Sequence, residues 1–154
     1  MRALAPIVCL AALVASPVAA QQGALSARYI EPTTRYDHGV LGDAVEYGAL
    51  EIKVKNGRVI VRLQVNRVFE DIAPLIADVD GDGDNEVITV ETDMARGAAL
   101  AIYDETGKIV ETPHIGQRYR WLAPTGAADL DGDGLIEIAY VDQPHLAKIL
   151  RVWR

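Results

Sequence analysis

The stretch Asp78-Val-Asp-Gly-Asp-Gly-Asp-Asn-Glu86 places carboxylates at its positions 1, 3, 5 and 9, around glycines at positions 4 and 6. The stretch Asp129-Leu-Asp-Gly-Asp-Gly-Leu-Ile-Glu137 repeats this arrangement 51 residues later. So many like charges in a short loop repel one another unless a cation lies between them. The two stretches therefore predict two cation sites, and their recurrence predicts a repeat fold.

The spacing suits calcium, which takes six to eight oxygen ligands and binds to loops in which glycine allows sharp turns. We expect carboxylates at positions 1, 3, 5 and 9 and a backbone carbonyl at position 7. The expected ligands are Asp78, Asp80, Asp82, Asp84 and Glu86 in the first loop, and Asp129, Asp131, Asp133, Leu135 and Glu137 in the second. The sequence thus predicts two Ca²⁺ sites.

The sequence after each loop is that of a strand. Residues 87–92 and 138–142 are rich in β-branched side chains. An EF-hand would need a helix there and a glutamate at loop position 12, which is Thr89 or Tyr140 instead. The alternative to a metal site is a solvated turn, because Asp and Gly are common turn residues. The same spacing in two copies, each before a strand, favours the metal sites.

The first twenty residues have the features of a secretory signal peptide. Arg2 precedes an apolar stretch over residues 3–14, and small residues lead to an expected cleavage after Ala20. That apolar stretch is too short to span a membrane. We also expect no membrane span in the mature chain, residues 21–154. Cys9 is the only cysteine and lies in the leader, so the mature chain has no disulfide to stabilise it. We expect bound calcium to stabilise the fold instead. The sequence predicts a secreted or periplasmic protein.

The acidity of the chain is concentrated in the two loops. The formal net charge is −7, and the loops hold nine of the 22 acidic residues. The other 13 acids are balanced by the 14 basic residues that follow the leader. Nothing in this balance indicates a polyanionic surface or a nucleic-acid partner.

The segments around the loops recur with a period of about fifty residues. Leu50, Leu100 and Leu150 have equivalent places, and Asn56-Gly57 marks a hairpin turn. Within one period we expect strands over residues 75–78, 86–91, 99–104 and 108–111. Four short antiparallel strands per period are typical of a β-propeller blade. The sequence thus predicts an all-β fold of propeller-type blades.

The expected blades do not complete a propeller. We expect a degenerate unit at about residues 36–67, loop-bearing units at about 68–117 and 118–154, and a truncated last unit. Propellers close with four or more blades. Either the chain is a fragment of a longer reading frame, or its open sheet edge pairs with another copy.

The two loops, each followed by a β run, resemble the FG-GAP/VCBS repeats of integrin-α-like β-propellers. The resemblance covers residues 68–154 well and residues 36–67 as a unit without a metal loop, although the Phe-Gly-Gly-Ala-Pro signature is not intact. It implies calcium held in hairpin loops that stiffen each blade. It also implies a scaffold used for adhesion or ligand binding and sometimes attached to an enzyme.

Few residues outside the loops suggest chemistry. His38 follows Asp37 in a polar cluster, and the aromatic and basic patch at 118–121 has groups that could hold a sugar or an acidic ligand. The alternatives are a loop histidine and a patch that packs the blade. His114 and His145 each follow a proline and are interpreted as loop residues, and nothing supports a zinc site.

Three hypotheses of function remain open. The first is a calcium-stabilised module that binds a protein or carbohydrate ligand outside the cell. The second is a calcium-assisted hydrolase or lyase acting on an extracellular polymer, which requires Asp37, His38 and the patch at 118–121 to lie within about 10 Å of one another. The third is a truncated copy without a function of its own.

Overall fold

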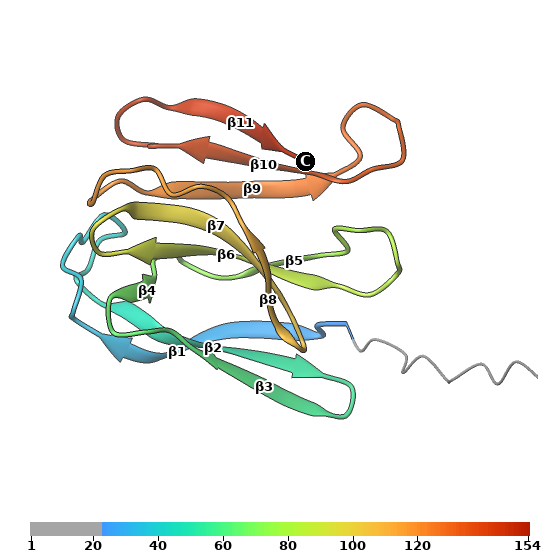
Figure 1. Cartoon of the computed structure of the whole chain (residues 1–154), viewed down its shortest axis with the longest axis horizontal. Helices are drawn as coiled ribbons and strands as arrows, with labels where there is room; N and C mark the ends of the chain where they lie inside the picture. Colours follow the sequence, from blue (N-terminus) through green and yellow to red (C-terminus); the bar gives the residue numbers. More distant parts are fainter. Residues whose placement is uncertain (1–22) are drawn as a thin grey trace, which may run out of the picture.

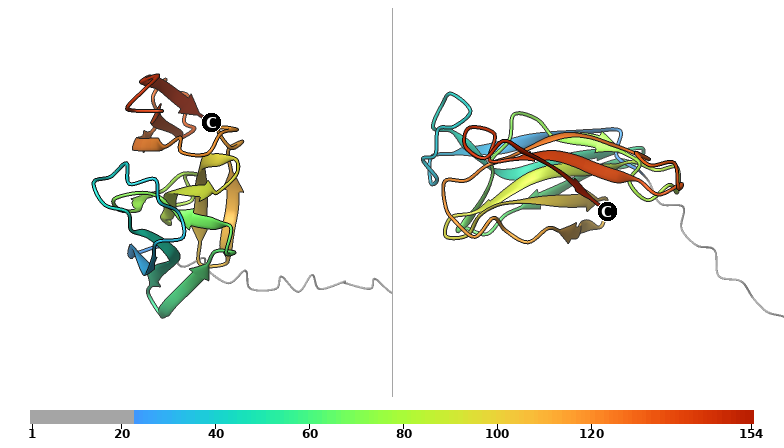
Figure 2. Two further views of the ribbon diagram at one scale, coloured as in Figure 1. Left: turned by 90° about the vertical axis from the view of Figure 1, so that its left-hand side faces the viewer. Right: turned by 90° about the horizontal axis from the view of Figure 1, so that it is seen from above.

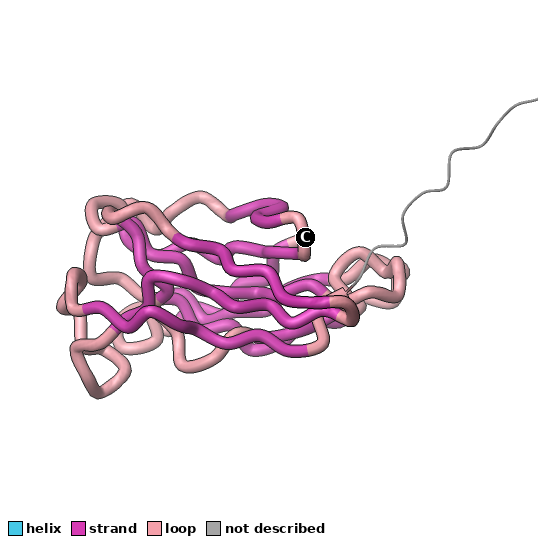
Figure 3. Tube along the Cα trace, turned by 90° about the horizontal axis from the view of Figure 1, so that it is seen from below, coloured by secondary structure: helices cyan, strands magenta, loops and turns pink. Residues whose placement is uncertain are grey.

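The computed structural model describes residues 23–154, in which every regular element is a strand (Figures 1 and 3). The predicted leader, residues 1–20, lies outside the described residues. The strands pair in antiparallel fashion and form two sheets that do not close into a barrel. The predicted all-β fold with propeller-like units is therefore confirmed. No helix among residues 23–154 has the length and apolar character to cross a membrane.

Three sheet units follow one another along the chain (Figure 1). The first unit contains β1–β3, the middle unit β5–β8 and the third unit β9–β11, while β4 bridges β2 of the first unit and β6 of the middle unit. The strands are β1 (Ser26–Thr33), β2 (Glu46–Val54), β3 (Gly57–Arg62), β4 (Arg67–Phe69), β5 (Leu75–Ala77), β6 (Glu86–Asp93), β7 (Gly97–Asp104), β8 (Gly107–Glu111), β9 (Leu122–Ala128), β10 (Glu137–Asp142) and β11 (Ile149–Trp153).

The middle unit is the blade that the sequence predicts. Its strands β5 to β8 pair in sequence order and lie within two residues of the four expected ranges. The first hairpin, β2–β3, also forms where Asn56-Gly57 predicts it, with Val54 opposite Gly57. Local patterning is sufficient here because the strands are short apolar or β-branched runs and each turn carries Gly or Asp.

The middle unit lies between the other two, so both of its faces are buried (Figure 2, left). In β7, Ala101 and Tyr103 face a core shared with the first unit. The alternate residues Leu100 and Ile102 face a second core, shared with the third unit. Since side chains alternate between the faces of a strand, one strand supplies two cores. This explains why all of β6 and β7 is buried.

The repeat equivalences of the sequence hold in position but not in burial. Leu50 and Leu100 lie in β2 and β7, face the next unit along the chain, and have no exposed surface. Leu150, on β11, is 65% exposed, and Val152 on the same strand is 55% exposed. The third unit thus presents to solvent the face that the first two units bury.

The connections between strands fall into two groups, one at each end of the units (Figure 1). The β5–β6 and β9–β10 connections, which carry the acidic stretches, lie at one end of the units. The β1–β2, β8–β9 and β10–β11 connections meet at the opposite end, where His38 and the patch at 118–121 are found. The fold therefore has two separate regions with candidate functional residues.

Candidate metal centres and a polar pocket

The first acidic loop, residues 78–86, joins β5 to β6. One carboxylate oxygen from each of Asp78, Asp80 and Glu86 lies within 4.8 Å of the other two. Glu86 begins β6 and is only 1% exposed, whereas Asp80 is exposed. Burial raises the pKa of Glu86, and the neighbouring Asp80 and Asp82 raise it further. The negative charges of the loop thus disfavour one another, which a bound cation would relieve.

Backbone donors hold this loop in a tight turn. Asp78 accepts hydrogen bonds from the N–H of Gly81 at 2.7 Å and of Gly83 at 3.0 Å. Both glycines have positive φ, +79° and +93°, a conformation that other residues rarely adopt. Glu86 Oε2 accepts a hydrogen bond from Val79 N at 2.8 Å, which closes the loop.

The second acidic loop, residues 129–137, has the same construction. Asp129 accepts hydrogen bonds from Gly132 N at 2.6 Å and Gly134 N at 3.0 Å, and Glu137 Oε2 accepts one from Leu130 N at 2.9 Å. The oxygens of Asp129, Asp131 and Glu137 also lie within 4.8 Å of one another. Every hydrogen bond named for the first loop thus has its counterpart here.

The second loop is also in contact with an arginine, Arg154, which follows β11. Arg154 Nη2 lies 2.9 Å from Asp131 Oδ2, and its Nη1 lies 3.1 Å from Asp133 Oδ2. The same guanidinium donates from Nε to Glu137 Oε1 at 2.8 Å. A positive group therefore already compensates the carboxylates of this loop.

The structure brings together six of the ten predicted ligands, three in each loop. Asp82 and Asp133 lie in the same turns and accept hydrogen bonds from the N–H of the residue two positions on. The side chain of Leu135 is 55% exposed, which agrees with a role for its main chain alone. The donors are all oxygen atoms, the ligand type of hard cations such as calcium and magnesium. The residues fit a divalent cation, while the role of each as a ligand stays a prediction.

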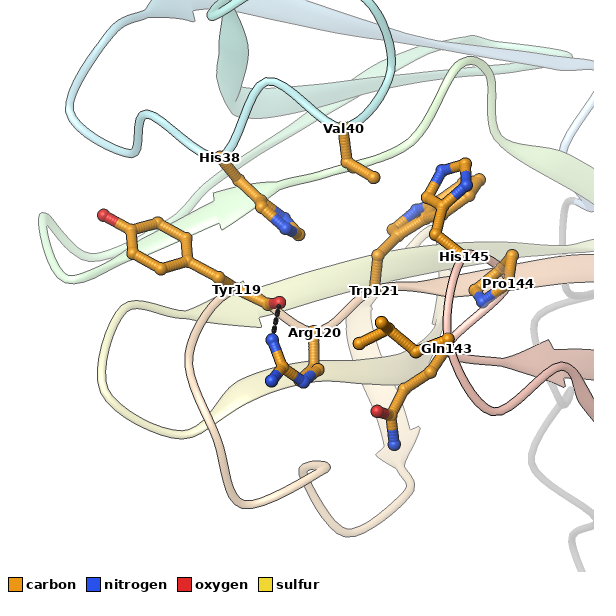
Figure 4. A pocket seen from close by; sticks show the side chains of 9 residues that line it. His38, Val40, Tyr119, Arg120, Trp121, Gln143, Pro144 and His145 are labelled. Carbon is orange, nitrogen blue, oxygen red and sulfur yellow. Dashed lines mark hydrogen bonds between the residues drawn. The ribbon is translucent and has the colours of Figure 1, made fainter.

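The polar pocket lies at the other end of the units (Figure 4). Its volume is about 50 Å³, enough for a group of a few atoms. The pocket is lined by His38, Val40, Tyr119, Arg120, Trp121, Gln143, Pro144, His145 and Leu146. None of these residues is a carboxylate, so the pocket surface is neutral or positive in a chain of net charge −7.

Asp37, His38 and the patch at 118–121 do converge. The hydroxyl of Tyr119 donates to Asp37 Oδ1 at 2.6 Å, and the Tyr119 N–H donates to the Tyr36 hydroxyl at 2.7 Å. The rings of His38 and Tyr119 lie 5.3 Å apart. The spatial condition set by the hypothesis of an enzyme is thus met.

Sequence reasoning missed the buried acid behind His38. Glu70 has no exposed surface and contacts His38 Nδ1, while Thr92 Oγ1 donates to it at 2.6 Å. Burial raises the pKa of Glu70 to about 7, and burial together with nearby Arg120 lowers the pKa of His38. The only indication of this in the sequence is that Glu70 interrupts the apolar segment before the first acidic loop.

The other two histidines have different surroundings. His114 lies outside the pocket, with Nδ1 2.7 Å from the carbonyl oxygen of Gly97. His145 lines the pocket and stacks on Trp121, with ring centroids 5.8 Å apart. The interpretation of both as loop residues agrees with their positions, and His145 in addition forms part of the pocket wall.

Comparison with known proteins agrees with this geometry. The family model of the FG-GAP-like repeat matches residues 78–140, which run from the first ligand of the first loop into β10 and include both loops. No curated protein and no solved structure matches the chain. The resemblance seen in the sequence is thus confirmed for residues 78–140, which are similar to an FG-GAP-like repeat.

Proposed function

We propose that this chain is an exported binding module in which calcium occupies the two acidic loops and stiffens the blades without taking part in catalysis. The observation that carries the proposal is the identical pattern of turns, glycines and carboxylates in the two loops. Bound calcium would join each strand pair at the point where the chain reverses. The opposite end of the units would then be held in place for a ligand.

Calcium should stabilise the fold by linkage, because it binds the folded loops and not the unfolded chain. Extracellular calcium modules bind with dissociation constants of about 0.1 to 1 mM. At 2 mM calcium we therefore expect a gain of roughly 0.6 to 2 kcal/mol per site, which for two sites corresponds to several degrees in Tm.

The test is a thermal melt of residues 21–154 in 2 mM calcium and in excess chelator. The double variant Asp80→Ala, Asp131→Ala should lose the calcium-dependent rise in Tm. A double variant of two acids outside the loops, Glu31→Gln with Glu51→Gln, should keep it. The Asp80→Ala, Asp131→Ala variant should have the same Tm with calcium and with chelator. If calcium raised its Tm as much as that of the unaltered chain, the proposal would be contradicted.

A second candidate is a hydrolase or lyase acting on an extracellular polymer, and the convergence of Asp37, His38 and Tyr119 supports it. Glu70 adds a group that exchanges protons near neutral pH. Incubation with a panel of polysaccharides, followed by assays for reducing ends and unsaturated products, tests this candidate. Activity that His38→Ala abolishes and His114→Gln retains would support it, and absence of any product would exclude it for that panel.

A further inference from the structure

A larger cleft lies between the middle and third units. One wall is the β8–β9 connection and the other is formed by β10 and β11, and its volume is about 390 Å³. Cavities that hold small organic ligands begin at about 300 Å³, so the cleft has room for a sugar ring. It is lined by Thr112, Pro113, Ile115, Leu122, Tyr140, Asp142, Gln143, Arg151 and Trp153.

Two aromatic side chains line the cleft from neighbouring strands. Tyr140 in β10 pairs with Arg151 in β11, two residues before Trp153. Both aromatic residues are half-buried and pack against the core shared with the middle unit, which fixes their rings. Burial raises the pKa of Tyr140, so its hydroxyl stays protonated. Rigid aromatic walls with polar edges suit a ring that has both C–H and O–H groups.

Asp142 supplies an acceptor without a donor. Its Oδ2 accepts a hydrogen bond from Arg151 Nε at 2.7 Å. The Asp142 side chain is about nine-tenths buried. Its other oxygen, Oδ1, is also buried and has no hydrogen-bond partner among the described residues. A buried carboxylate oxygen without a partner is costly, so rotation of the Asp142 side chain toward a donor in the cleft would be favourable.

The charges of the cleft cancel. Arg151 and Asp142 are its only charged lining residues, and they form an ion pair. The pair still offers an acceptor, Asp142 Oδ1, beside the Nη donors of the guanidinium. A vicinal diol presents the complementary set, one hydroxyl to donate and a neighbouring oxygen to accept. The cleft thus selects a neutral ligand rather than an acidic one.

We propose that this cleft binds a neutral sugar ring, with one hydroxyl donating to Asp142 Oδ1 and the adjacent oxygen accepting from Arg151. The ring packs against Trp153 and Tyr140. The inference rests on the binding role proposed above, to which it gives a place and a ligand class. A single sugar of about twelve heavy atoms at usual ligand efficiency binds with a dissociation constant of about 1 to 10 mM.

The experiment follows the two indole N–H signals of the chain by NMR, because Trp121 and Trp153 are its only tryptophans. The protein in 2 mM calcium is titrated with the methyl glycosides of glucose, galactose and mannose. We expect saturable shifts of the Trp153 signal with at least one glycoside and a constant Trp121 signal. Cyclohexanol, a ring of the same size with one hydroxyl, should bind at least fivefold more weakly.

Two variants test the polar contacts. Asp142→Asn and Arg151→Lys should each weaken binding at least fivefold, and the Trp121 signal reports whether the fold is kept. Because Arg151 is half-exposed, its lysine variant should fold even if the buried asparagine variant does not. Asp37→Asn, at the polar pocket, is the matched control and should bind the glycoside as the unaltered chain does.

Three results would overturn the inference: no shift with any glycoside, equal binding of cyclohexanol, or unaltered affinity in the Arg151→Lys variant. The titration is repeated in chelator to separate this inference from the proposed role of calcium. A calcium-dependent Tm without sugar binding contradicts only the inference. Sugar binding without a calcium-dependent Tm contradicts only the calcium part of the proposed function.

Discussion

Arg154 and Asp104 occupy equivalent positions in the third and middle units. Trp153 pairs with Ile138 as Tyr103 pairs with Val87, which places the next residue beside the glutamate that closes each loop. In the middle unit, Asp104 is buried and accepts hydrogen bonds from its own turn, at Thr106 and Gly107. In the third unit the residue is basic and contacts the loop. The two loops therefore share acidic residues at positions 1, 3, 5 and 9, and the residue beside the closing glutamate is acidic in the middle unit and basic in the third.

Replacing Arg154 should strengthen cation binding by the second loop. Calcium must displace the guanidinium from Asp131 and Glu137, so Arg154→Gln should lower the dissociation constant of that loop about three- to tenfold. Calorimetric titration in an Asp80→Ala background, which disables the first loop, isolates the effect. Arg118→Gln, at the opposite end, is the control. Unchanged affinity in Arg154→Gln would show that the guanidinium does not compete.

Glu46 should make the fold less stable at alkaline pH. Burial, with smaller contributions from Glu70 and Asp43, raises the pKa of Glu46 to about 8. A carboxyl whose folded pKa is raised stabilises fully below its unfolded pKa of about 4.5, and that stability is lost as the pH rises to 8. Glu46→Gln should therefore gain about 2 kcal/mol at pH 9 and almost nothing at pH 4.5.

Urea unfolding of the unaltered protein and of Glu46→Gln at several pH values measures this difference in stability. The acidic loops titrate in the same way in both proteins, so their contribution cancels in the comparison. The control is Glu51→Gln. Arg28 lowers the pKa of Glu51, so the loss of this carboxylate should reduce stability at neutral pH, the opposite sign. A pH-independent effect of Glu46→Gln would refute the assignment.

Arg67 should be far more important for stability than other arginines on the first unit. It contacts Glu91, which has no exposed surface and also receives Lys108 Nζ at 2.6 Å. Arg67→Met leaves a buried carboxylate with less compensation and should cost about 3 kcal/mol. Arg62→Met, which breaks an exposed pair with Glu31, should cost less than about 0.5 kcal/mol. Equal losses in chemical denaturation would argue against this network.

Gly97 should not tolerate a side chain. A Cβ there would lie 2.0 Å from the carbonyl oxygen of Gln117, and φ is +78°. Gly97→Ala should destabilise the fold by about 3 kcal/mol or more and shift the connection that carries Tyr119. Gly116→Ala has a similar φ of +90° with open space around it, and should cost only about 1 kcal/mol. Thermal melts compare the two, and similar costs would mean that backbone strain alone matters.

The middle unit and both loops could be predicted because their signals are local. β-branched residues define β6, a short continuous apolar run defines β7, and Asp and Gly define the turns between strands. β1 gave no such signal. Its sequence has few apolar residues and contains Pro32, and at the edge of the sheet half of its residues are exposed and none is buried. Pairing with β2, about twenty residues later, makes it a strand.

The polar pocket and the cleft could not be read from the sequence. Asp37 and Tyr119 are 82 residues apart, and only the stacking of the first and third units around the middle one brings them into contact. Buried acids such as Glu91 also occur between apolar residues of their strands, as exposed polar residues do. The sequence pattern therefore does not distinguish the two. Only the tertiary partners Arg67, Lys108 and Tyr103 make their burial tolerable.

The alternation of β7 between two cores limits how this protein can change during evolution. Inserting or deleting one residue in the strand would exchange Leu100 and Ile102 with Ala101 and Tyr103, and both cores would lose their shape at once. The turns at the two strand ends carry no such double constraint. Differences in length between copies of this unit should therefore collect in the acidic loops and in the connections around the polar pocket, while the strands keep their length.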